Sequence, residues 1–318
     1  MKAHKKLSQS ATFRILFSDD IVPPYIPLTY RFYLLFSKLR DSLFKRLTTR
    51  KRQTAVIFPA PAFASEVSLG EVSGPLVNKS IMSQDEDLAT AASQTYAESL
   101  ASLRRSLQDS GLRATNSAGN FKQKDFRPEP ERRKLWENTF VLAHACPGPA
   151  DTVLDLGGAS TLFSFYLASL GCQTHVLDYD VGHYGLIYNA RHVSRAMDWN
   201  MRVYNRDLAR PLPFSRDTFD KVYCICVLEH LSPQVRRRTM GEIARVLKPG
   251  GMAALTFDFN AQRKDPWTDQ GLRFGHKEAL ARDILEPSGL KIFGNEILKD
   301  DCPREFFLGA LFLVKSAG

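Results

Sequence analysis

Four acidic residues stand where short apolar segments of this 318-residue chain end. They are Asp155 after Val153-Leu154, Asp178 after Val176-Leu177, Asp207 in Asn205-Arg-Asp-Leu208, and Glu229 at the end of Lys221–Leu231. In nucleotide-binding α/β folds, an acid at the end of the second strand accepts hydrogen bonds from both ribose hydroxyls. Ligands of open parallel sheets bind at the carboxyl ends of the strands. The spacing therefore predicts a small-molecule site built from strand ends, with Asp178 on a ribose and Asp207 on the exocyclic amine of an adenine.

The first of these strand ends carries two glycines. Gly157 and Gly158 allow a tight turn and a close approach to a ligand, and the helix that follows offers its N-terminal amides. A dinucleotide fingerprint would read G-x-G-x-x-G, but the chain reads Gly157-Gly-Ala-Ser-Thr-Leu162. Asp155 would repel a pyrophosphate and suits a ligand with an ammonium group and no phosphate. Asp180 is the alternative to Asp178 for the ribose.

Alternating strands and helices must position these loops. The segment Lys221–Val227 is almost continuously apolar, which is typical of a strand buried on both faces of a parallel sheet. The pattern predicts a doubly wound α/β fold, a mostly parallel, seven-stranded, Rossmann-like sheet with helices on both faces. The expected strands are 152–156, 173–177, 201–204, 221–227, 252–257, 290–296 and 306–314, and the expected helices are 83–110, 129–145, 161–170, 182–194, 233–247 and 278–286.

Together these segments resemble the class I S-adenosylmethionine-dependent methyltransferases, in the broad small-molecule methyltransferase-domain group. The resemblance covers about residues 150–260 and, more loosely, 128–315. The segments on which the resemblance is based occur in the family's order and at suitable spacing. They are Val153–Thr161, Val176–Asp180, 207–219 with Pro211-Leu-Pro-Phe214, Phe219–Leu231 and Arg245–Gly251.

The resemblance implies S-adenosyl-L-methionine as the cofactor and assigns residues to it. Asp155 anchors the first loop near the methionine part, Asp178 holds the ribose, and Asp207 and Leu208 flank the adenine. The implied cofactor-binding set is Asp155, Gly157, Gly158, Ser160, Asp178, Tyr179, Asp207, Leu208, Ile225 and Cys226. One departure concerns the family's usual G-x-G-x-G, which reads Gly157-Gly-Ala159-Ser-Thr161 here; Ala and Thr are small enough for the loop to accept them.

The reaction that the resemblance implies is direct displacement at the sulfonium methyl, in which the protein contributes mainly alignment and desolvation. His230 is the candidate general base, since histidine titrates near neutrality; the alternative is that it braces the turn. Glu229 is interpreted as structural. Trp136 and Phe140 either cover the cofactor or belong to the core.

The acceptor is expected to be a small or lipid-like molecule held by the polar insert 258–276. Trp267, Phe274 and His276 are the candidate lining residues. The tetrapeptides N-P-P-Y and D-P-P-Y do not occur, which argues against amino methylation of nucleobases. Two other hypotheses stay open: a non-catalytic binding module on the same fold, and a nicotinamide-dependent oxidoreductase, which the failed fingerprint disfavours.

The amino-acid composition and the distribution of charge limit the classes of protein and of binding partner to be expected. With 44% hydrophobic and 24% charged residues, the chain is neither wholly disordered nor fibrous. The net charge of +9 is concentrated in residues 1–81, which hold 13 Lys/Arg and 5 Asp/Glu, so a nucleic-acid partner is not expected for the balanced remainder. The five cysteines include no C-x-x-C pair, which argues against a disulfide framework and against a metal site. This cysteine usage favours a reducing, cytoplasmic compartment.

The sequence divides into a basic extension (1–81), a helix with a linker (82–127) and the methyltransferase-like domain (128–318). Residues 30–47 mix aromatic and basic residues, a pattern typical of an amphipathic helix on an anionic membrane or of an organelle-targeting segment. A third interpretation is a poorly ordered extension upstream of a natural start at Met82.

Overall fold

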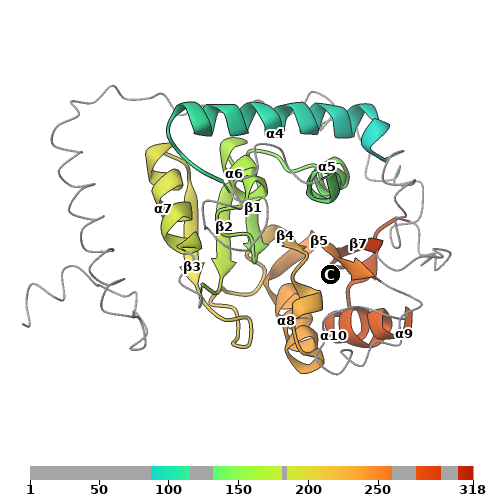
Figure 1. Cartoon of the computed structure of the whole chain (residues 1–318). Coiled ribbons are helices and arrows are strands. Elements are labelled where there is room, and N and C mark those ends of the chain that lie inside the picture. The colour runs from blue at the N-terminus through green and yellow to red at the C-terminus, as the bar shows by residue number, and fades with distance from the viewer. Residues whose placement is uncertain (1–86, 115–131, 181–184, 260–276, 295–306, 318) are drawn as a thin grey trace, which may run out of the picture. The chain divides into compact units, whose positions relative to one another are not determined.

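A computed structural model describes residues 87–114, 132–180, 185–259, 277–294 and 307–317. The contacts divide the chain into the units Met1–Thr54 and Ala55–Gly318, and all described residues lie in the second unit. Their centre is a seven-stranded sheet with the strand order β3-β2-β1-β4-β5-β7-β6 (Figure 1). The mostly parallel, doubly wound sheet predicted from the sequence is confirmed. Residues 1–81, with the basic aromatic segment 30–47, lie outside the described residues.

The first five strands are parallel, and β7 runs antiparallel to both of its neighbours. Leu156 lies opposite both Leu177 and Cys224, so the three central strands end at the same level. That register brings the loops predicted to carry the site to one edge of the sheet. The strands are β1 (Thr152–Leu156), β2 (Gln173–Asp178), β3 (Met201–Asn205), β4 (Phe219–Ile225), β5 (Leu247–Phe259), β6 (Lys291–Ile292) and β7 (Phe307–Val314).

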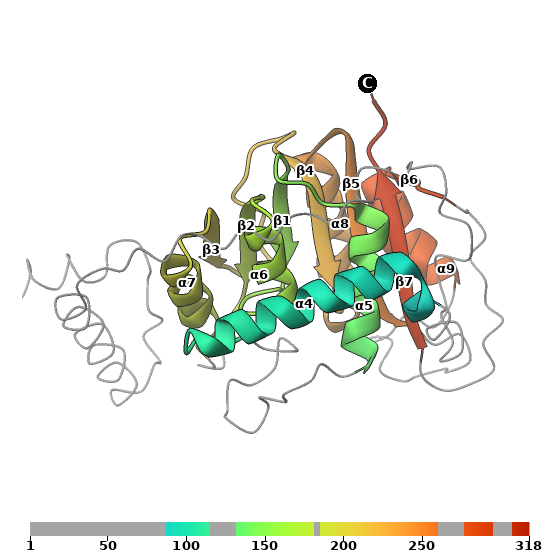
Figure 2. The same ribbon diagram turned by 90° about the horizontal axis from the view of Figure 1, so that it is seen from above.

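Helices cover both faces of the sheet (Figures 1 and 2). On one face lie α4 (Ala91–Asp109), α5 (Arg132–Ala145) and α6 (Leu162–Ser169), and on the other lie α8 (Pro233–Val246), α9 (Lys277–Leu280) and α10 (Glu286–Ser288). Helix α7 (Leu186–Ala196) packs along β3. Within the described ranges, no helix is both long enough and apolar enough to cross a membrane.

Local sequence explains where these helices begin. Thr90, Thr161 and Ser232 each precede a helix and accept a hydrogen bond from a backbone amide of its first turn. Pro233 then occupies the first position of α8, where its missing N–H costs nothing. Trp136 is fully buried and stacks on Phe140, so these two side chains belong to the core.

Some element boundaries differ from the sequence expectation. Helix α7 begins at Leu186, because its N-cap Gly185 has a left-handed φ of 75°. Strand β5 begins at Leu247, before the expected Lys248–Gly251 turn, and a register shift in its pairing with β4 absorbs the extra residues. The helix predicted for 278–286 is present as α9, a π-helical turn (Ala281–Leu285) and α10.

The three consecutive arginines of α8, Arg236–Arg238, differ in exposure. Arg236 is only 3% exposed and donates to Asp283 Oδ2 over 2.9 Å. Its remaining guanidinium nitrogens donate to the carbonyls of Leu228 and Leu231. Arg236 therefore ties α8 to the π-helical turn and to the segment after β4. The hydrophobic stripe of the helix could not reveal this, because the partner lies 47 residues away.

Candidate functional site

Asp155 lies beneath the loop that follows β1. Its carboxylate is buried, and Ser164 Oγ donates to its Oδ2 over 2.5 Å. A Cβ on Gly158 would overlap that carboxylate and press on the Ser164 hydroxyl, so only glycine fits there. Burial raises the pKa of Asp155 to about 7, with a smaller contribution from Asp178, while the Ser164 hydrogen bond lowers it. A cation bound near Asp155 would therefore favour the ionised carboxylate at neutral pH.

Asp178 links the end of β2 to the same loop. Its Oδ2 accepts a hydrogen bond from Ala159 N (3.1 Å) and its Oδ1 from Tyr179 N (2.7 Å). Burial raises the pKa of Asp178, although both amides work against the shift. Tyr179 beside it is 49% exposed. Each carboxylate oxygen keeps a further lone pair, so the position remains suited to the two hydroxyls of a ribose.

The two departures from the glycine pattern fit the loop without distortion. Ala159 is fully buried, and its amide is the donor to Asp178. Thr161 caps α6 through its hydroxyl. Ser160 adopts a left-handed φ of 66°, and its hydroxyl donates to Leu186 O over 2.6 Å. The altered positions are thus accommodated, since Ala159 is buried and Thr161 serves as the N-cap of α6.

Asp207 and Leu208 follow β3 at this edge. Asp207 is half-buried, and its Oδ1 accepts from Ala209 N over 2.7 Å, which closes a local turn. Leu208 is buried. The turn leaves the second carboxylate oxygen of Asp207 for an adenine amine, which stays a prediction.

The end of β4 meets a buried polar network from α5. Cys226 follows Ile225 with a left-handed φ of 52°, and its amide donates to Thr256 O. The thiol donates to Glu137 Oε1 over 2.6 Å, and the Thr256 hydroxyl donates to the same oxygen. Lys134 pairs with the other oxygen of Glu137 at 2.7 Å. The expected strand 221–227 therefore ends two residues early, and Cys226 lies in a turn instead of sharing a strand face with Cys224.

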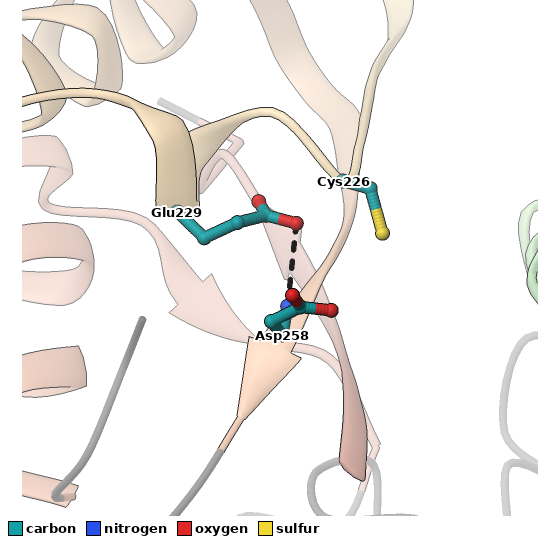
Figure 3. Close-up of side chains that lie close together, drawn as sticks. All are labelled: Cys226, Glu229 and Asp258. Carbon is teal, nitrogen blue, oxygen red and sulfur yellow. Dashed lines mark hydrogen bonds between the residues drawn. The ribbon is translucent and has the colours of Figure 1, made fainter. Parts of the chain in front are cut away.

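Glu229 and His230 lie in the 3-10 helix Leu228–His230 and differ in exposure. Glu229 is 1% exposed, and its Oε1 accepts from Asp258 N over 3.3 Å (Figure 3). Burial, with smaller contributions from the Asp258 and Glu137 carboxylates, raises the pKa of Glu229 to about 8. His230 is exposed. Its candidate role as general base stays a prediction.

The predicted acceptor residues Trp267, Phe274 and His276 lie outside the described residues. Sequence reasoning missed two polar residues that the fold adds to this edge, Lys134 and Glu137, and it included Asp258 only as the first residue of the acceptor insert. A charged residue on the apolar side of the predicted helix 129–145 was the available signal for Glu137. Its partners, however, are 89 and 119 residues away.

Comparison with known proteins agrees with this geometry. Residues 153–251 match the family model described as a methyltransferase domain. This match agrees with the resemblance to methyltransferases that the sequence motifs indicate.

Similar proteins are found by sequence and by structure. An uncharacterized methyltransferase of Synechocystis sp. is 31% identical over 118 residues, 36% of this chain, and the alignment spans half the length of that relative. A solved S-adenosylmethionine-dependent methyltransferase of Methanosarcina mazei shares 21% identity with a TM-score of 0.40, covering 54% of this chain and 94% of its own. The cyclase SpnF shares 16% identity with a TM-score of 0.49, covering 65% and 88%.

Gly157 offers a test of the loop with a matched control. Gly157 has a φ of +82°, and an added Cβ would overlap the Val227 side chain. Gly250 has a φ of +78°, and nothing lies within 4 Å of an added Cβ. We expect Gly157→Ala to weaken cofactor binding more than about tenfold, since the loop must move, while Gly250→Ala costs only the backbone strain of about 1–2 kcal/mol. Calorimetric titration and urea denaturation of both variants measure the two effects. Equal behaviour of the pair would contradict the steric role of Gly157.

Proposed function

We propose that this protein transfers a methyl group from S-adenosylmethionine to a small-molecule or lipid-like acceptor. The proposal rests on two acidic residues at the ends of neighbouring strands that contact the same loop. Asp155 lies under the Gly157-Gly158 turn, and Asp178 holds the same loop through the Ala159 amide. A loop of this kind, between a buried acid and a second acid, suits a cationic nucleoside without phosphate groups.

The residues fit the cofactor by their chemistry. We assign the ribose hydroxyls to Asp178, and the absence of a Cβ at Gly157 and Gly158 lets a ligand approach the backbone. When bound, the cofactor supplies a methyl group already activated by its positive sulfur. The chain's own contribution is then to hold that sulfur and the acceptor in line and to exclude water, which is worth up to roughly 7–11 kcal/mol.

The acceptor side is proposed to lie next to the ends of β4 and β5. Cys226, Glu229 and Asp258 gather there, and Val227 of the same turn contacts Gly157 of the cofactor loop. A carboxylate in this cluster could take a proton from an acceptor hydroxyl or amine. The buried Glu229, with its raised pKa, favours acceptors that give up a proton near neutral pH.

Two measurements on the full-length chain test the proposal. The first is calorimetric titration with S-adenosylmethionine, for which we expect micromolar binding. The second follows formation of S-adenosylhomocysteine with a panel of small amines, phenols, carboxylic acids and fatty-acid derivatives. Absence of binding at millimolar cofactor would refute the proposal. Binding without transfer to any member of the panel would favour the non-catalytic binding module.

Cofactor affinity is expected to rise with pH through the titration of Asp155. The carboxyl of the free protein, with a pKa of about 7, is mostly neutral at pH 6 and mostly ionised at pH 8. A cationic ligand favours the ionised form, so binding releases a proton and lowers this pKa. The affinity should be about tenfold higher at pH 8 than at pH 6. Titrations in two buffers of different ionisation enthalpy count the released proton, and Asp155→Asn should show a flat profile. A pH profile unchanged by that substitution would assign the titration elsewhere.

A further inference from the structure

Ser160 has an unusual backbone conformation in the cofactor loop, residues 157–161. Its φ of 66° lies in the left-handed region, which residues other than glycine seldom adopt. The side chain is fully buried, so its hydroxyl needs partners inside the protein. That hydroxyl donates to Leu186 O over 2.6 Å and accepts from Asn189 Nδ2 over 3.1 Å. Both partners lie at the start of α7, so α7 holds Ser160 in this conformation.

Asn189 also contacts the chain that follows α4. Its Nδ2 donates to Arg113 O over 2.9 Å, and a side-chain amide has two N–H groups to give. Figures 1 and 2 show α4 running across the face of the sheet so that its C-terminal end lies beside α7. Ser160 and Arg113 are 29 and 76 residues from Asn189 in the sequence. One side chain therefore joins the cofactor loop, α7 and the end of α4.

The Arg113 carbonyl follows a firmly closed helix end. Gly111 has a left-handed φ of 69°, and its amide donates to Gln108 O over 2.9 Å. The next amide, Leu112 N, donates to Leu107 O over 2.7 Å, and the Leu112 side chain is buried. These two bonds form a Schellman motif, which satisfies carbonyl groups of the last helical turn. Asn189 therefore ties the cofactor loop to an end of α4 that is itself held in place.

The departures from the glycine pattern explain why the cofactor loop needs this support. Ala159 and Thr161 stand where the pattern of the resembled family has glycine, and the left-handed conformation falls on Ser160. Hydrogen bonds from a side chain, and not the conformational freedom of glycine, then fix the loop. Because Ala159 N donates to Asp178 Oδ2, a shift of the neighbouring Ser160 would also move the amide that contacts this acid.

We propose that Asn189 is a positioning residue that couples the cofactor loop to α4. The inference rests on the proposed function, because it takes residues 157–161 as the loop that meets S-adenosylmethionine. Asn189 acts through Ser160: its amide group holds the hydroxyl, and the hydroxyl holds the left-handed backbone that orients the loop. Because coupling between two sites is reciprocal, cofactor binding also stabilises the end of α4. Residues 87–113 then belong to the cofactor-binding unit and not to a separate helix and linker.

A double-mutant cycle in the full-length chain, measured by calorimetric titration with S-adenosylmethionine, tests the action through Ser160. We expect Asn189→Ala and Ser160→Ala each to weaken binding about five- to tenfold, since each removes hydrogen bonds that fix the loop. The double variant should bind about as weakly as Ser160→Ala alone, because the second substitution removes a contact already lost. A loss equal to the product of the single effects, roughly 25- to 100-fold, would show independent action and overturn the proposal.

Ser194→Ala is the matched control on the same helix. Its buried hydroxyl lies near the other end of α7, within hydrogen-bond distance of Met201 O (3.1 Å) and Trp199 O (3.3 Å). The variant therefore loses a buried hydrogen bond of α7 without changing the contact with Ser160. We expect its affinity for S-adenosylmethionine to stay within about twofold of the unmodified chain. A loss as large as that of Asn189→Ala would assign the effect to the stability of α7 and contradict a positioning role.

Amide hydrogen exchange separates failure of this coupling from failure of the proposed function. In the free protein, Asn189→Ala should speed exchange at Ala159 N and Leu112 N at least threefold, and Ser194→Ala should not. S-adenosylmethionine should slow exchange at Leu112 N in the unmodified chain but not in Asn189→Ala. Unchanged exchange at both amides in Asn189→Ala would overturn the proposal even where the cofactor binds. Absence of cofactor binding to the unmodified chain would refute the proposed function, whereas the exchange rates of the free protein still decide whether Asn189 holds the loop.

Discussion

Replacing Asp178 with asparagine is expected to weaken S-adenosylmethionine binding about 100-fold. Both carboxylate oxygens accept backbone amides, Ala159 N on one side and Tyr179 N on the other. An asparagine has only one acceptor oxygen, so in either orientation its amide group would face one of these N–H donors. A hydrogen bond to a charged group is worth about 1.5–3 kcal/mol. Losing it, together with one acceptor for the ribose, corresponds to one to two decades in affinity.

Asp180→Asn is the matched control for this substitution. It removes the same charge from Asp180, which lies two residues further along and is the alternative ribose-binding residue in the sequence analysis. Asp180 contributes its own amide to Asn205 Oδ1, a bond that the substitution leaves intact. We expect a change of less than about threefold, since a partly exposed charge acts weakly through solvent. Calorimetric titration of both variants measures the difference, and a larger loss in Asp180→Asn would reverse the assignment.

The strand ends were predictable because their signal is local. The segment Val153–Leu156 is short and apolar, the acid and the glycines follow at fixed spacing, and strand order follows from right-handed crossovers. The edge that gathers Asp155 and Asp178 therefore follows from sequence and topology alone. Boundaries were less certain where glycines allow two interpretations, as at Gly185 and in the Lys248–Gly251 turn.

The polar network of Glu137, Cys226 and Thr256 was not predictable because each of its contacts joins distant segments. Glu137 meets Cys226 only after α5 packs on the sheet at one particular helical rotation, with its charged residue facing inward. Burying a charge is unfavourable unless it is paired, so a glutamate on the apolar side of a helix indicates a buried partner. The sequence does not show which residue that partner is, because Cys226 and Thr256 lie 89 and 119 residues away. Arg236 is a second case, since the sequence shows three consecutive arginines and only the fold selects which one is buried.

Arg236→Ala is expected to lower the free energy of unfolding by about 3–5 kcal/mol, because it breaks one side of a buried ion pair. The guanidinium is 3% exposed and donates hydrogen bonds to Asp283 Oδ2, Leu228 O and Leu231 O. Its removal leaves the buried Leu228 carbonyl and the partly buried Leu231 carbonyl without that donor. It also leaves Asp283, whose side chain is fully buried, dependent on arginines that are more exposed. Urea denaturation followed by circular dichroism measures the loss.

Arg237→Ala is the matched control, since Arg237 pairs with the other oxygen of the same Asp283 at 3.0 Å but is 42% exposed. Exposed ion pairs contribute about 0–1 kcal/mol, so this variant should remain close to the unmodified chain. Similar losses in the two variants would show that burial does not set the strength of the pair. Because Arg236 also holds both ends of the segment Leu228–Leu231, its loss should loosen the 3-10 helix that carries Glu229.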